Sequence, residues 1–208
     1  MYKPICLLAL LPLFSFASSV AFSGAFTQDD NMLEYEFTIA ATSTVTLESF
    51  GYAGGTAGST SVPAGGFAPV LSVFGAGSSG ALTLLGFDDG GTAPSACDPR
   101  SVDPVSHLCL DPYLVMTSQN PGTYLVVLTE NDNTPNGPDF AGGFNEQGNG
   151  NFTGGPFIDP FGNQRNGNFY FTISGADSAA ALPEPSTVSL LIAGLGLLSF
   201  KRKLQLSR

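Results

Sequence analysis

The sequence predicts an all-β body: a single jelly-roll-like β-sandwich with long Gly/Asn-rich loops. Short segments alternate apolar and polar residues with a period of two, which is the pattern of half-buried strands. Stretches rich in Gly, Pro, Asn and Ser separate these segments and supply turn chemistry. Apolar spacing of the helical kind is scarce between the two chain ends. An N-terminal signal helix and a short C-terminal transmembrane helix are expected to flank the body.

The first 21 residues have the three parts of a secretory signal peptide. Lys3 precedes an apolar run over residues 5–16, and small residues follow that run. Ser19 and Ala21 fit the −3 and −1 positions of a cleavage site, so we expect cleavage after Ala21. Such a signal delivers the chain to the Sec translocation machinery. The alternative interpretation is a buried N-terminal helix.

The body is expected over residues 22–176, followed by a linker over residues 177–182 that leads into the C-terminal tail. Seven apolar or alternating segments predict its strands, at residues 33–39, 45–47, 69–74, 81–87, 113–116, 123–129 and 169–173. Short strands with turn chemistry between them favour a sandwich or a jelly roll.

Two stretches of the body predict long loops, at residues 51–66 and 132–165. The second is too long for an idle connection in a compact domain. Five phenylalanines recur along it, at positions 140, 144, 152, 157 and 161. Because disordered segments are poor in aromatic residues, we expect these rings to anchor the loop over an edge of the sandwich. Disorder is the alternative.

The body is strongly acidic. Between residues 22 and 182 sixteen acidic side chains face two arginines, which leaves a net charge of −14. A negative field of this size argues against binding nucleic acid or an anionic membrane surface.

In an exported protein, Cys97 and Cys109 predict a disulfide across a short loop, and two buried free thiols are the alternative.

The C-terminal tail, residues 183–208, has three parts in order. Pro183-Glu184-Pro185 comes first, an apolar run follows over residues 187–200, and Lys201-Arg202-Lys203 begins the basic end at 201–208. Basic residues just past an apolar segment hold that end in the cytoplasm. The tail resembles the PEP-CTERM sorting signal of Gram-negative bacteria. The resemblance implies a transient inner-membrane anchor that an exosortase cuts near the Pro-Glu-Pro, releasing the protein to the outer surface or the extracellular matrix.

A second resemblance concerns the body. Its motifs lie at residues 66–74, 88–91, 110–114 and 121–129, in that order. They resemble the jelly-roll domains related to pre-peptidase C-terminal domains. The resemblance implies a non-catalytic module, of a kind in which some relatives bind calcium or polysaccharide.

Acidic and amide side chains gather at predicted strand ends and in loops. They are Asp88, Asp89, Asp111, Asp132, Asn133 and Asp139. Carboxylates, amides and free backbone carbonyls are the oxygen ligands of Ca²⁺, so one interpretation is a calcium site. The other is that these side chains cap turns by bonding their own backbone.

Together these features predict an exported, exosortase-sorted surface or matrix protein that is not an enzyme and associates with extracellular polysaccharide. One alternative is a secreted glycan-active enzyme that uses acids such as Asp88 and Asp111. Another is a permanently anchored envelope binding protein whose tail is never cut.

Overall fold

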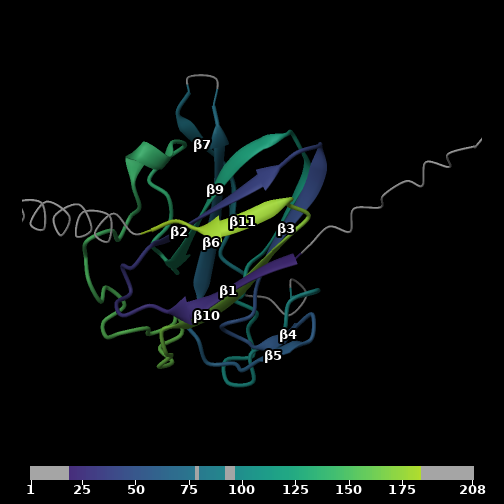
Figure 1. Ribbon diagram of the computed structural model, residues 1–208. Coiled ribbons are helices and arrows are strands. Elements are labelled where there is room, and N and C mark those ends of the chain that lie inside the picture. Colours follow the sequence, from purple (N-terminus) through teal and green to yellow (C-terminus); the bar gives the residue numbers. More distant parts are fainter. Residues whose placement is uncertain (1–18, 78–79, 92–96, 184–208) are drawn as a thin grey trace, which may run out of the picture.

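The computed structural model describes residues 19–77, 80–91 and 97–183, and these form an all-β sandwich (Figure 1). One sheet has the order β1-β10-β3-β8 and the other has the order β11-β2-β9-β6-β7. Every pair of neighbouring strands in the two sheets is antiparallel. The predicted all-β sandwich class is therefore confirmed.

The four-stranded sheet contains β1 (Ser19–Ala25), β3 (Ser43–Ser49), β8 (Tyr113–Gln119) and β10 (Asn168–Ser174). The five-stranded sheet contains β2 (Leu33–Ile39), β6 (Pro69–Ala76), β7 (Leu82–Asp88), β9 (Gly122–Glu130) and β11 (Ser178–Ala181). A separate hairpin joins β4 (Gly55–Ala57) to β5 (Thr60–Val62), and η2 is a single 3₁₀ turn at Phe140–Gly142.

The core forms between the inner faces of the two sheets, because strand side chains alternate between faces. In β10 the odd-numbered Phe169, Phe171 and Ile173 are buried, and the residues between them are not. They share one cluster with inward residues of the other sheet such as Phe37 and Tyr124, whose rings stack at 5.0 Å. Complete burial of one large apolar side chain stabilises the folded state by about 1.5–3 kcal/mol.

The second predicted long loop, residues 132–165, covers part of the outer face of the five-stranded sheet, and we call it the long loop. Leu125 and Val127 of β9 point away from the main core and pack with Phe74 and Phe144. Phe144 and Phe157 are buried, and the partly buried Phe140 packs on Phe74 with ring centres 5.4 Å apart, so the predicted anchoring is confirmed at these three positions. Phe161 is 56% exposed, and its predicted role as an anchor is wrong.

The predicted disulfide is confirmed. Cys97 and Cys109 are bonded, with their Cα atoms 5.3 Å apart, and both residues are buried. The bond closes a loop that begins after the edge strand β7 and ends where Cys109 forms a β-bridge to Gly91.

Four strands appear where the sequence did not predict them. β1 begins at Ser19, β4 and β5 lie in the first predicted long loop, and β11 lies in the predicted linker. β4, β5 and β11 are short, and β11 is built largely from alanine, so none has a clear apolar alternation.

The chain ends lie largely outside the described residues. Glu184, Pro185, Lys201, Arg202 and Lys203 are among them, as are residues 1–18 of the predicted signal peptide and the apolar run at 187–200. Within residues 19–77, 80–91 and 97–183 no helix has the length and apolar character needed to cross a membrane.

Candidate functional site

The six residues predicted as calcium ligands are spread over the molecule. Asp88 pairs with Arg100 and also accepts hydrogen bonds from the backbone N–H of Gly90 and of Tyr113. Asp89 is exposed beside it, and Asp139 is exposed at the start of η2 with no side-chain capping bond.

Asp111 is buried and holds a turn in place. Its carboxylate accepts hydrogen bonds from Ser49 Oγ at 2.8 Å and from the N–H groups of Tyr52 and Ala53 at 3.0 and 2.7 Å. Burial raises the pKa of this carboxyl, although the hydrogen bonds act in the opposite direction. Asp111 therefore fixes the chain where β3 leaves the sheet.

Asp132 and Asn133 are a second adjacent pair among the six, just after β9. Asn133 is buried, and its side-chain oxygen accepts a hydrogen bond from the N–H of Glu146 at 2.9 Å. Across the described part of the chain, no three His, Cys, Asp or Glu side chains are gathered as a ready-made metal cluster.

A buried ionic cluster joins the disulfide loop to the long loop. Arg165 donates to Asp103 at 2.9 and 3.1 Å and to Asp159 at 3.0 Å, and its guanidinium lies 4.1 Å from the centre of the Tyr52 ring. The Tyr52 hydroxyl donates to Asp159 at 2.8 Å, and its oxygen lies 2.8 Å from Ser106 Oγ. We name Tyr52, Asp103, Asp159 and Arg165 the arginine clamp.

The clamp holds its acids ionised. Burial alone would raise the pKa of Asp103, but hydrogen bonds from Arg165 and Ser106 outweigh it and lower the pKa to about 2. The pKa of Asp159 is lowered in the same way by its backbone and side-chain donors. With all these groups satisfied and little exposed, the clamp has the character of a structural element.

An acidic pocket of about 410 Å³ lies at the end of β9, beside the clamp. Glu130 and Asp132 line it from the end of the strand. The long loop supplies the opposite wall, which contains Phe152, Thr153, Ile158, Asp159, Pro160 and Gly162.

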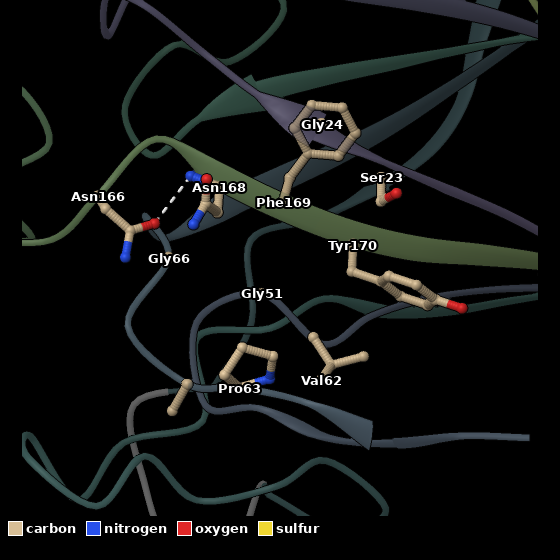
Figure 2. Close-up of a pocket in the computed structure, with 11 residues that line it drawn as sticks. Ser23, Gly24, Gly51, Val62, Pro63, Gly66, Asn166, Asn168, Phe169 and Tyr170 are labelled. Atoms are coloured by element: carbon tan, nitrogen blue, oxygen red, sulfur yellow. Dashed lines mark hydrogen bonds between the residues drawn. The ribbon is translucent and has the colours of Figure 1, made fainter. Parts of the chain in front are cut away.

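A larger groove of about 570 Å³ lies on the outer face of the four-stranded sheet (Figure 2). We call it the outer groove. Ser23 of β1 and Tyr170 of β10 are cross-strand partners, and Asn168 lies two residues before Tyr170 on the same face of the strand. The β4–β5 hairpin and the turn after it form the other wall through Val62, Pro63 and Ala64.

Glycines form the floor of the outer groove because the backbones approach closely there. A Cβ at Gly66 would lie 2.3 Å from the carbonyl oxygen of Asn168 and 2.7 Å from that of Gly51. The Gly66 N–H donates to the Gly51 oxygen at 2.9 Å, which closes the turn after the hairpin. Only glycine permits this approach, and it leaves an open floor between the two walls.

Several polar side chains that line the outer groove have few hydrogen bonds to the rest of the described residues. Asn166 Oδ1 accepts a hydrogen bond from the Asn168 N–H at 2.9 Å, drawn as the dashed line in Figure 2. Among the described residues no hydrogen bond engages the hydroxyls of Ser23 and Tyr170 or the side-chain amide of Asn168. Figure 2 shows the two asparagines at one end of the groove and Ser23 with Tyr170 at the other, with Gly51 between them.

This groove was not predicted from the sequence. Its eleven lining residues come from β1, from the segment around the β4–β5 hairpin and from β10, and none of them carries a formal charge at neutral pH. A search for charged or metal-binding motifs cannot detect such a site. The alternation of Asn168, Phe169 and Tyr170 was the available signal, since it predicts that Asn168 and Tyr170 share an outward face.

No protein-family model matches the chain, and neither the curated proteins nor the solved structures contain a match.

Proposed function

We propose that this chain is an exported, exosortase-sorted surface or matrix protein that acts without catalysis and binds neutral extracellular polysaccharide in its outer groove. The carrying observation is the combination in one groove of an aromatic ring, free amide and hydroxyl groups, and a glycine floor. The jelly-roll-like arrangement and the kinship to pre-peptidase C-terminal domains belong to the same proposal.

The chemistry of the outer groove suits a sugar chain. A pyranose ring has an apolar face, which stacks on an aromatic ring, and a rim of hydroxyls that need donors and acceptors. Tyr170 supplies the aromatic ring, and it is held edge-on against Phe50 with the ring centres 6.2 Å apart. Asn168 and Ser23 supply groups that can both donate and accept hydrogen bonds.

The charge of the body selects among polysaccharides. A net charge of −14 over residues 22–182 repels polymers that carry carboxylate or sulfate groups. The outer groove adds no cationic side chain that would offset this repulsion. Neutral glycans are therefore the class of ligand that the groove accepts with the smallest electrostatic cost.

The test is gel electrophoresis of the purified protein through matrices that contain a neutral polysaccharide or alginate. We expect the neutral polymer to retard the protein and alginate to leave its mobility unchanged. Asn168→Ala and Tyr170→Phe should each weaken the retardation about 5-fold to 10-fold, since a net hydrogen bond contributes about 1 kcal/mol.

Asn120→Ala is the matched control, because Asn120 is exposed like Asn168 but lies at the turn between β8 and β9. It should bind like the unaltered protein. Equal retardation of all three variants, or no retardation of the unaltered protein by the neutral polysaccharide, would refute the outer groove as a glycan site.

A further inference from the structure

Glu130 is the most unusual carboxylate of the described residues. It ends β9 on the same face as Val126 and Leu128, so its side chain continues the inward row of the strand. It is 0% exposed, and neither carboxylate oxygen has a hydrogen-bond partner within the described residues. A buried polar group without partners destabilises the fold, and a charged one does so more strongly.

Three further carboxylates, Asp29, Asp132 and Asp159, are near enough for their charges to raise the pKa of Glu130, and two of them already have fixed partners. Asp29 accepts hydrogen bonds from the N–H groups of Phe157 and Thr153 at 2.6 and 3.1 Å. Asp159 belongs to the arginine clamp. Asp132 is the exception, because it is exposed and lines the acidic pocket together with Glu130.

Protonation of Glu130 would remove its charge but would still leave its carboxyl group without hydrogen-bond partners among the described residues. Burial and the charges of Asp29, Asp132 and Asp159 raise its pKa to about 10, so a proton reduces the charge. A neutral carboxyl still carries an O–H donor that needs an acceptor. A group that neutralises the charge and also coordinates the oxygens satisfies both requirements.

We propose that the acidic pocket binds a divalent cation of the calcium class, with the Glu130 carboxylate as its buried ligand and the Asp132 carboxylate as its ligand at the mouth. Calcium takes about six to eight oxygens and accepts backbone carbonyls and water beside carboxylates. Two carboxylates therefore suffice, which agrees with the absence of a three-carboxylate cluster among the described residues.

The site would connect two parts of the fold. Glu130 and Asp132 belong to the end of β9, and the opposite wall from Phe152 to Gly162 belongs to the long loop. A cation held by the first part and by oxygens of the second would oppose opening of that loop. A cation that binds the folded state but not the unfolded state raises the unfolding temperature.

The experiment uses the full chain, purified in a mild detergent, and follows thermal unfolding in EDTA, in calcium, and in magnesium at equal ionic strength. For an extracellular type of affinity, we expect about 10 mM calcium to raise the midpoint by about 3–10 °C over EDTA, with a smaller rise in magnesium. Calorimetric titration with calcium should show one binding event per chain.

Glu130→Gln keeps the shape of the side chain and removes its charge, so it should fold and lose the calcium response. Asp132→Asn should weaken calcium binding about 10-fold or more. Asp139→Asn is the matched control, because Asp139 is an exposed acid of the same long loop outside the acidic pocket. It should respond to calcium like the unaltered protein. Equal midpoints in all three solutions, or a calcium response that survives in Glu130→Gln, would overturn the proposal.

Discussion

Arg165 and Asp111 show how single buried residues hold the loops of this sandwich. Each has several fixed partners, and the partners belong to segments far apart in the sequence. Arg165 links Tyr52 before the β4–β5 hairpin, Asp103 inside the disulfide loop, and Asp159 in the long loop. A change at this position should therefore affect three loops together.

We predict that Arg165→Ala lowers the free energy of unfolding by about 3–5 kcal/mol, because it leaves two carboxylates buried without their counter-charge. Asp103 and Asp159 have side chains with 0% exposure in these ion pairs. Chemical denaturation at neutral pH measures the loss.

Arg100→Ala is the comparison, since Arg100 also pairs with an aspartate, Asp88, but the two side chains are 13% and 16% exposed. We expect its loss to be smaller than that of Arg165→Ala. A larger loss for Arg100→Ala would show that the disulfide loop, and not the arginine clamp, dominates the stability of this end of the molecule.

At the scale of elements, apolar alternation predicted the strands that bury one face. Residues 33–39 were predicted as a strand and form β2, because Tyr35, Phe37 and Ile39 supply a clear inward row. β1 was not predicted, because its residues overlap the small-residue end of the signal peptide pattern. β11 was not predicted either, since its alanines give no alternation and only its pairing with β2 defines it.

The candidate site was less predictable than the strands. Asp132 was among the predicted calcium ligands, but Glu130, its partner in the proposed site, was not. Glu130 occupies a core-facing strand position, where a charged residue is rare, and that conflict with the apolar row of β9 was the signal in the sequence. Of the other predicted acids, Asp88 and Asp111 accept hydrogen bonds from turn and loop backbone, a role that only the three-dimensional structure distinguishes from metal binding.

The position of β1 means that the predicted cleavage after Ala21 would affect the stability of the fold. Ser19, Val20 and Ala21 pair with residues of β10, and a cut after Ala21 would remove these three pairs. A chain that begins at Ser18 should therefore be more stable than one that begins at Phe22 by about 1 kcal/mol, from a few tenths for each cross-strand pair.

Refolded chains with the two starting points, compared by thermal unfolding, measure this difference. In both chains Phe22 remains, and its ring packs 5.2 Å from that of Phe171. Identical midpoints would mean that the first three residues of β1 contribute nothing, and N-terminal sequencing of the natural product then identifies the cut.

At the scale of the whole molecule, the proposed function depends on the tail at residues 183–208. Replacing Pro183, Glu184 and Pro185 with alanine should leave the protein uncut and retained in the inner membrane, because the proposed recognition sequence of the exosortase is removed. Cell fractionation and intact mass of the product measure both effects. Replacing the exposed Ser178 of β11 with alanine gives the control, which should mature normally. Normal maturation of the triple alanine variant would refute sorting through this motif.

The pairing of β11 has a consequence for the timing of that cut. Leu182 N–H donates to the carbonyl oxygen of Glu34 at 2.8 Å, so the chain is fastened to the edge of the sheet one residue before Pro183. Only a few residues separate Pro183 from the apolar run that begins at residue 187, and an extended residue spans no more than about 3.6 Å. Once β11 pairs with β2, few residues therefore separate the folded body from the proposed cleavage motif. Under the proposed sorting, folding and processing would compete in time: a protease that needs an extended substrate would have to act before β11 joins the sheet, or after that edge detaches.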